Sequence, residues 1–261
     1  MGKVWIKTKY DTGMGMDIPH SPNFAQAMYG FKELGAEIKT YHLIDDFYEK
    51  VSDEDIVVDY VDQCQEIFKK FGVYPEFQDY PDVMKEYLGR KIWKDTISSI
   101  ADHEEKWSAG YFVKPVKTKM FTGKIISTIY DLCGTGNSNE DYEVWVSEPV
   151  SIAAEWRCFI MYDRILDIRP YGLVSGENYD GYKYHYDYDT VRDMLNRFIT
   201  WDDRPAACSM DICVTKEGKT LLVEMNDAYA LGCYGLHSLF YAKFLSARWS
   251  QLMNRKDEYT F

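Results

Sequence analysis

The sequence has little positive charge. Its 261 residues include 30 Lys and Arg against 42 Asp and Glu, which gives a formal net charge of −12 at pH 7. A protein that binds nucleic acid or an anionic membrane through general electrostatics has the opposite balance. We therefore expect neither a nucleic-acid partner nor a membrane partner, although a local basic pocket remains compatible with the acidic total.

Long apolar runs and paired cysteines are also missing. No apolar segment reaches the roughly 20 residues that a membrane-spanning helix needs, and the first residues, MGKVWIKTKY, do not read as a signal peptide. The six cysteines form no Cys-x-x-Cys pair, and the five histidines are scattered. This spacing argues against a zinc site and a disulfide framework, and it favours a reducing, cytoplasmic location.

Two common nucleotide-binding signatures are absent as well. The chain contains neither a Walker G-x-x-x-x-G-K-[ST] loop nor a G-x-G-x-x-G loop. The hydrophobic share of 46% is that of an ordinary globular protein, and a chain of this length buries a sizeable core.

The first third of the chain alternates between strand and helix patterns, which predicts a small α/β unit with a largely parallel sheet. We predict strands at 4–6, 38–44 and 55–58 and helices at 24–34 and 61–71. The segment 83–100 then reads as a basic helix that carries Arg90 and Lys94.

The character of the chain changes after residue 110. A β-rich middle with glycine turns precedes two hairpins and two helices. We predict strands at 111–116, 125–129 and 143–146, hairpins at 156–171 and 210–225, a helix near 191–201 capped by Asp189 or Thr190, and a final helix at 236–253. The predicted domains are residues 1–105, 106–150 and 151–261.

Two carboxylates stand out in the second hairpin. A turn centred on Glu217-Gly218 places Asp211 directly opposite Glu224, and Asn226 lies on the same face as Glu224. Opposed carboxylates on apolar strands repel each other, and a divalent cation removes the conflict. Oxygen ligands from Asp, Glu and Asn suit Mg²⁺. The alternative is a solvated strand face with two chance acids.

A second group of polar residues is less decisive. Lys114 lies within an apolar strand, just before a Thr-Gly turn, where it is either a phosphate ligand or an edge-strand lysine that deters aggregation. Glu148 ends a strand and Glu155 follows an irregular connector at 151–154. Because Pro149 has no N–H, a backbone donor to a base edge must come from Val150 or beyond.

The ordered set of motifs resembles the ATP-grasp ligases, the superfamily of D-alanine–D-alanine ligase and glutathione synthetase. The set contains Val-Lys-Pro-Val at 113–116, Phe-Thr-Gly at 121–123, Glu-Trp-Arg at 155–157, Asp-Ile at 211–212 and Glu-x-Asn at 224–226. It looks most like a small group, common in bacterial and phage genomes, that is named for two arginines and a lysine. The likeness spans about 83–230.

The resemblance implies an ATP-grasp fold of mixed α+β and α/β class. In this fold an N-terminal α/β unit precedes two α+β lobes that sandwich ATP. It also implies an ADP-forming carboxylate–amine ligase that works through an acyl phosphate, with ATP and Mg²⁺ as cofactors. The substrates are then a small-molecule or peptide carboxylate and an amine, in the cytoplasm of a bacterial or phage-infected cell. The alternatives are an ATP-grasp small-molecule kinase and a non-catalytic nucleotide-binding module.

Residue roles follow from the same resemblance. The matching positions are Lys114 and Lys183 for phosphate, Glu148, Pro149 and Val150 for adenine, Glu155 for ribose, Asp211, Glu224 and Asn226 for the metal, Arg157 and Arg169 for phosphate or the acyl substrate, and Arg90 or Lys94 for phosphate. Many ligases have an arginine two positions before the metal Asp, whereas this chain has Ser209. Arg157 or Arg169 is the candidate for that role. A three-residue turn at 162–164 would pair these arginines directly, and a two-residue turn would place them on opposite faces.

Overall fold

The computed structural model describes residues 2–117, 120–136, 141–171 and 184–260. It divides the chain into two compact units, Met1–Tyr87 with Ala153–Phe261, and Leu88–Ile152. The division at 152–153 lies beside the boundary predicted at 150–151. The other predicted boundary, at 105–106, falls inside the smaller unit, because residues 88–105 pack with the strands that follow them.

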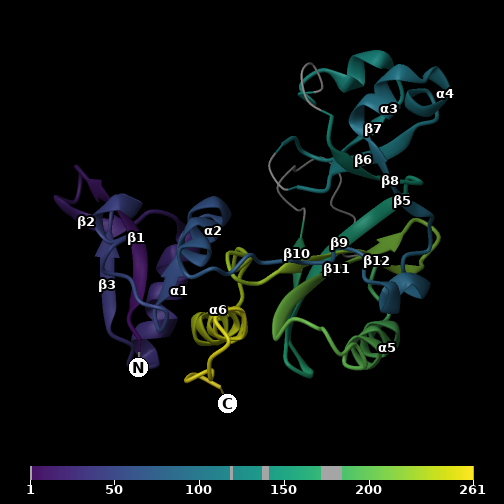
Figure 1. The fold of residues 1–261 in the computed structure, drawn as a ribbon. Helices are drawn as coiled ribbons and strands as arrows, with labels where there is room; N and C mark the ends of the chain where they lie inside the picture. The colour runs from purple at the N-terminus through teal and green to yellow at the C-terminus, as the bar shows by residue number, and fades with distance from the viewer. Residues whose placement is uncertain (1, 118–119, 137–140, 172–183, 261) are drawn as a thin grey trace. The chain divides into compact units, whose positions relative to one another are not determined.

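The larger unit begins with a sheet in which β1 pairs in parallel with β3 and β4 and antiparallel with β2 (Figure 1). The predicted parallel α/β unit is therefore present. Its elements are β1 (Val4–Asp11), β2 (Met16–Pro19), α1 (Pro22–Glu33), β3 (Ile38–Tyr41), a 3₁₀ turn (Ile44–Asp46), β4 (Ile56–Val58) and α2 (Val61–Lys70).

Helix α1 begins and ends where its sequence indicates. The Ser21 hydroxyl accepts a hydrogen bond from the Phe24 N–H at 3.3 Å, and Pro22 occupies the first turn, where a missing N–H costs nothing. Gly35 follows the helix with φ of 76°, the left-handed conformation that glycine adopts without strain.

The same unit contains a second sheet in the order β10-β9-β11-β12. Its elements are β9 (Ile152–Met161), β10 (Arg164–Tyr171), α5 (Tyr188–Phe198), β11 (Ala207–Thr215), β12 (Thr220–Asp227) and α6 (Ser238–Leu252). The connector expected at 151–154 is irregular only at its start, since β9 begins at Ile152. The cap of α5 is Asp187, not Asp189 or Thr190, because its carboxylate accepts the Thr190 N–H at 2.9 Å.

Helices α1 and α6 lie in contact within one hydrophobic core. Phe31 from α1 and Phe244 and Trp249 from α6 are fully or almost fully buried in it, together with Phe159 of β9. Gly30 allows the close approach of the helices, because a Cβ there would lie 2.0 Å from the Ser238 carbonyl oxygen. The final helix thus joins both sheets of the larger unit.

The smaller unit is a sheet in the order β5-β8-β6-β7, with two short helices (Figure 1). Its elements are β5 (Ile92–Thr96), α3 (Ile97–Asp102), α4 (Glu104–Trp107), β6 (Tyr111–Pro115), β7 (Lys124–Ile126), a 3₁₀ turn (Ile129–Leu132) and β8 (Glu143–Ser147). Val113, Val144 and Val146 point into a core that also contains Ile97 and Ile100 of α3.

The basic helix predicted over 83–100 is wrong. The segment consists of a 3₁₀ helix (Asp82–Tyr87), the strand β5 and only then the short helix α3. Gly89, with φ of 61°, lies in the connection between the first two elements. Pairing of β5 with β8 outweighs the helical spacing of the apolar residues.

Two further sequence expectations concern membranes and cysteines. Within the described part of the chain, none of the helices combines the length and apolar character that crossing a bilayer requires. All six cysteines have free thiols, and Cys64, Cys158, Cys208 and Cys213 are buried. These four pack as small hydrophobic side chains, as their spacing suggested.

Candidate active site

The acidic hairpin has the predicted register. Asp211 on β11 pairs with Glu224 on β12, and Ser209 pairs with Asn226. A bulge follows Asp211, so the pairing beyond it shifts by one residue. Asp211 is completely buried, which places a carboxylate inside the unit and requires compensating donors.

Asp211 accepts hydrogen bonds from four donor atoms. Arg157 binds it through Nε to Oδ1 at 2.8 Å and Nη2 to Oδ2 at 2.6 Å, and the Ser209 hydroxyl lies 3.2 Å from Oδ1. The Asn226 amide nitrogen donates to Asp211 Oδ2 at 3.0 Å and to Glu224 Oε1 at 3.3 Å. The Asn226 side chain therefore bridges the two carboxylates that the register brings together.

The Arg157–Asp211 pair is an ion pair in a dry setting. Burial raises the pKa of Asp211 above its ordinary value, and the hydrogen bonds from Arg157 oppose that shift. Burial also works to lower the pKa of Arg157, but the hydrogen bonds and charge of Asp211 outweigh it and raise the pKa overall. Arg157 is thus a permanent cation on Asp211, whereas the resemblance assigned it to phosphate or the acyl substrate.

The hairpin β9–β10 places Arg157 directly opposite Arg169. The turn has two residues, since Arg164 pairs with Met161, and a bulge between Ile165 and Asp167 then shifts the register by one. Both predicted alternatives assumed a regular ladder, so the expected link between turn length and pairing is wrong. Arg169 is 40% exposed and binds Asp167 through Nε at 2.7 Å.

Glu155 precedes Arg157 by two residues and shares its face of β9. Burial raises the pKa of Glu155 to about 7, with further contributions from the charges of Asp211 and Glu224. This carboxyl group therefore senses the acids of the hairpin. Its predicted contact with ribose stays a prediction.

The smaller unit carries a row of two lysines and a tryptophan. Lys94 on β5 and Lys114 on β6 both pair in register with Trp145 on β8, so the three side chains share one face of the sheet. The Lys94 ammonium lies 5.2 Å from the centre of the Trp145 ring and 3.5 Å from Glu143. This face is opposite the valine core that packs on α3.

Gly123 lies against this lysine row. A Cβ at Gly123 would lie 2.6 Å from the Phe112 ring and 2.9 Å from the Lys114 Cβ. The Thr-Gly turn predicted beside Lys114 is therefore packed on it so closely that only glycine fits without displacement.

The remaining predicted residues lie near the start of β5 or beyond the described structure. Arg90 Nη1 donates to the Leu88 carbonyl at 3.0 Å, and the Glu148 carboxylate accepts the Lys91 N–H at 3.0 Å. Val150 accepts a hydrogen bond from the Ile152 N–H at 3.0 Å, and Pro149 is exposed. Lys183 lies outside the described residues.

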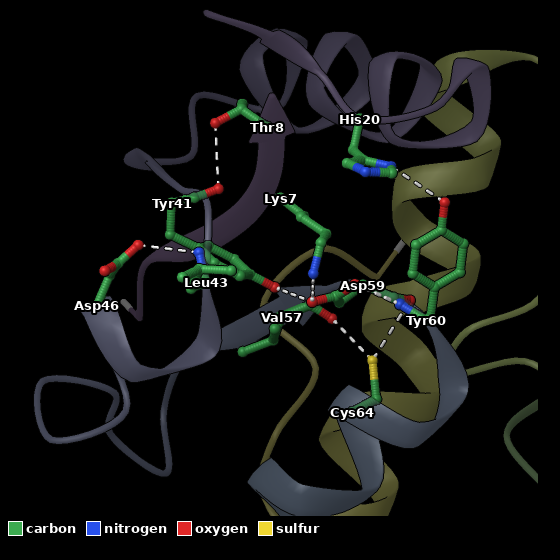
Figure 2. A network of polar contacts seen from close by, with 10 residues as sticks. All are labelled: Lys7, Thr8, His20, Tyr41, Leu43, Asp46, Val57, Asp59, Tyr60 and Cys64. Carbon is green, nitrogen blue, oxygen red and sulfur yellow. Dashed lines mark hydrogen bonds and ion pairs between the residues drawn. The ribbon is translucent and has the colours of Figure 1, made fainter. Parts of the chain in front are cut away.

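The N-terminal sheet of the larger unit contains a buried polar network around Asp59, which is 2% exposed (Figure 2). Its Oδ2 accepts hydrogen bonds from the Tyr41 hydroxyl at 2.7 Å and the Lys7 ammonium at 3.2 Å. Burial, followed by the Asp59 charge, raises the pKa of Tyr41, so this hydroxyl stays a donor. Asp59 also lines a cavity of about 300 Å³ together with Asn23, Phe24, Tyr60, Gly232 and Tyr241.

The donor set of the hairpin fits a hard cation. Two carboxylates and an amide offer only oxygen ligands, the type that Mg²⁺ prefers, and Mg²⁺ usually retains several waters. Three or more His, Cys, Asp or Glu side chains in a metal-binding arrangement do not occur within the described ranges. A metal here would accordingly rest on Asp211, Glu224 and Asn226 together with non-protein ligands.

A protein-family model decides the relationship: the model of an ATP-grasp domain, family 2 of its clade, matches residues 87–244, more than half of the chain. The chain belongs to this ATP-grasp family. The predicted superfamily is thereby confirmed, and so is the mixed α and β fold class. No curated protein sequence matches the chain.

Solved structures support the ATP-grasp fold along almost the whole chain. A D-alanine–D-alanine ligase from Bacillus anthracis is similar at TM-score 0.58 and 12% identity, over 97% of this chain and 99% of that one. D-cycloserine synthetase DcsG is similar at TM-score 0.56 and 11% identity, over 97% and 98%. The macrocyclase MdnC from Microcystis aeruginosa MRC, bound to precursor peptide MdnA, has TM-score 0.51 and 12% identity, over 94% and 99%.

Three aromatic residues of these sites were not found from the sequence. Trp145 lies between the two lysines, and Tyr171 and Tyr234 each contact the Arg157 guanidinium, at 4.1 and 4.4 Å from their ring centres. Strand alternation could have indicated Tyr171, which follows Arg169 by two positions. No sequence signal connects Tyr234 to Arg157, because the contact depends on how the segment after β12 folds back.

Proposed function

We propose that this ATP-grasp protein is an ATP-dependent, ADP-forming carboxylate–amine ligase. ATP phosphorylates a carboxylate, and an amine then attacks the acyl phosphate, forming an amide and releasing phosphate. The observation that carries the proposal is the buried set of Asp211, Glu224 and Asn226. Opposed acids inside a protein are costly to maintain, and a binding site for a cation is their simplest use.

The charges around the hairpin suit a cation that accompanies a polyphosphate. Glu224 and Asp211 supply two negative charges, Arg157 neutralises one of them, and Glu155 adds acid whose charge depends on its pKa of about 7. Mg²⁺ would supply Lewis-acid charge stabilisation of the transferring phosphoryl group. Asp211, Glu224 and Asn226 are the side chains that would hold it.

The lysine row of the smaller unit supports the phosphate-binding part of the proposal. Lys94 and Lys114 present two ammonium groups on one face of the sheet, beside the glycine turn at 122–123. Phosphoryl transfer needs positioning and cations more than a protein nucleophile. We assign Lys114 to phosphate, Lys94 or Arg90 to a supporting contact, and Glu148 with the backbone at 149–150 to adenine. Lys183 is proposed as the second phosphate lysine.

The cavity beside Asp59 is our candidate for the substrate pocket. Its volume of about 300 Å³ suits a small organic molecule, and its lining mixes aromatic rings with Asn23 and Asp59. Residues on both sides of the larger unit contribute to it, namely the start of α1 and the segment after β12. This supports small-molecule or peptide carboxylate and amine substrates without identifying them.

The decisive experiment measures ADP and free phosphate from Mg·ATP with a mixture of carboxylates and amines. A ligase releases both products only when both substrates are present. A small-molecule kinase gives ADP without free phosphate, and a non-catalytic nucleotide-binding module gives a thermal shift with Mg·ATP and no turnover. Either of these results would overturn the ligase proposal.

Glu224→Gln tests the metal assignment directly. We expect loss of turnover and of the Mg²⁺-dependent part of the ATP thermal shift, with little change in folding, because Glu224 is only partly buried. Glu217→Gln is the matched control, since it makes the same change in the exposed turn of the same hairpin. Wild-type turnover in Glu224→Gln would contradict the assignment of Glu224 as a metal ligand.

We also keep the finer predictions as proposals. Arg157 and Arg169, which face each other across β9 and β10, fit a group named for two arginines and a lysine. The cytoplasm of a bacterial or phage-infected cell is the proposed location, since free thiols are compatible with it.

A further inference from the structure

The Arg157 guanidinium is held by aromatic rings as well as by Asp211. Its central carbon lies 4.1 Å from the centre of the Tyr171 ring and 4.4 Å from that of Tyr234. The two rings are themselves in edge-to-face contact, with centres 5.2 Å apart and planes at 74°. They therefore cover two sides of the guanidinium, which is part of a side chain only 3% exposed.

Tyr234 holds this position in an unfavourable backbone conformation. Its φ is 43°, in the left-handed region that disfavours side chains with a Cβ. The residue is 47% exposed, so burial of its ring contributes little to the core. Gly232 makes room for the ring, because a Cβ there would lie 2.9 Å from it. The strain and the exposed ring are hard to explain by packing alone.

The segment that carries Tyr234 is fixed to α1. The Asn23 side-chain oxygen accepts a hydrogen bond from the Cys233 N–H at 3.1 Å, and the Cys233 thiol lies at the same distance. Tyr234 is thus anchored through its neighbour, and its ring does not depend on Arg157 alone for its position. The opposite ring, Tyr171, lies on β10 and pairs with Glu155.

We propose that Tyr171 and Tyr234 are positioning residues that hold the Arg157 guanidinium in its two-bond orientation on Asp211. Arginine has a long, flexible side chain, and orienting its planar head costs conformational entropy. Ring faces attract the cation and restrict its rotation, and the effect is strongest away from water. The importance of this orientation for catalysis rests on the proposed function, while the orientation itself can be measured without it.

The test follows hydrogen exchange of the Arg157 Nε–H, which donates to Asp211 Oδ1. Its ¹H–¹⁵N signal in the full-length protein is identified by its loss in Arg157→Lys. In Tyr234→Leu we expect exchange to accelerate about tenfold, in line with a desolvated cation–π contact of roughly 1–2 kcal/mol. Tyr234→Phe retains the ring face and is expected to stay within about threefold of wild type.

Two further variants separate positioning from general loosening. Tyr29→Leu makes the same change on the exposed side of α1 and should leave the Arg157 signal unchanged. Gly232→Ala keeps both tyrosines but displaces the Tyr234 ring, so it should accelerate exchange even if Tyr234→Leu folds poorly. Unchanged exchange in both Tyr234→Leu and Gly232→Ala, or equal acceleration in Tyr234→Phe and Tyr234→Leu, would overturn the proposal.

A second measurement distinguishes this inference from the proposed function. The thermal shift with Mg·ATP is recorded for wild type and Tyr234→Phe. Absence of any shift in wild type would contradict ATP binding while leaving the exchange result intact. A normal shift together with unchanged exchange in Tyr234→Leu and Gly232→Ala would instead overturn only the positioning role.

Discussion

Replacing Arg157 with leucine removes the only guanidinium that binds the buried Asp211 in the described structure. The carboxylate would then keep the Ser209 hydroxyl at 3.2 Å and the Asn226 amide at 3.0 Å, but no opposite charge. Breaking one side of a buried ion pair typically costs about 3–5 kcal/mol, because the remaining charge stays buried without compensation. Asp211 is 0% exposed, so we expect Arg157→Leu to fall in this range.

Urea unfolding measures this loss, and a double-mutant cycle shows its origin. Asp211→Leu and the double variant Arg157→Leu/Asp211→Leu complete the cycle. Removing both charges leaves no unpaired ion, so the double variant should be less destabilised than the sum of the two single variants by about 2 kcal/mol or more. A loss below about 1 kcal/mol in Arg157→Leu, or simple additivity in the cycle, would refute the reasoning.

Three further outcomes are expected. Gly30→Ala should destabilise the protein by about 2 kcal/mol despite its better helix propensity, because the new Cβ would lie 2.0 Å from the Ser238 carbonyl oxygen; thermal unfolding measures this, with Gly13→Ala as a near-neutral control. Gly123→Ala should weaken the Mg·ATP thermal shift by displacing the turn from Lys114, and an unchanged shift would dissociate that turn from ATP binding. Glu224→Gln should abolish turnover while Glu217→Gln retains it, as measured by release of ADP and phosphate.

The acidic hairpin shows what strand pairing allows a sequence to predict. Turn residues at 216–219 define a centre, and side chains alternate along each strand, so the pairing of Asp211 with Glu224 follows from local geometry. The arginine hairpin shows the limit. Its turn length was not decided, and a bulge between Ile165 and Asp167 restored direct pairing where an uninterrupted ladder would have prevented it.

The segment 83–100 shows the opposite outcome. Its apolar residues recur at helical spacing, yet residues 92–96 form a strand because β8 lies ready to pair with them. Propensity is a weak guide where a long-range partner satisfies the same backbone groups. The correction matters for the site, since it moves Lys94 from a helix to the strand face that also carries Lys114.

The sequence by itself determined the family, the α/β start of the chain, the acidic hairpin and the residues that fit ATP and Mg²⁺. These conclusions depend on spacing, alternation and motif order, all of which are local or ordered along the chain. Only the tertiary structure decided that Arg157 pairs with Asp211 and is covered by Tyr234. The first contact joins residues 54 positions apart through neighbouring strands, and the second depends on a folded-back segment still further along the chain. The physical reason is that long-range packing, unlike strand alternation, has no period along the sequence.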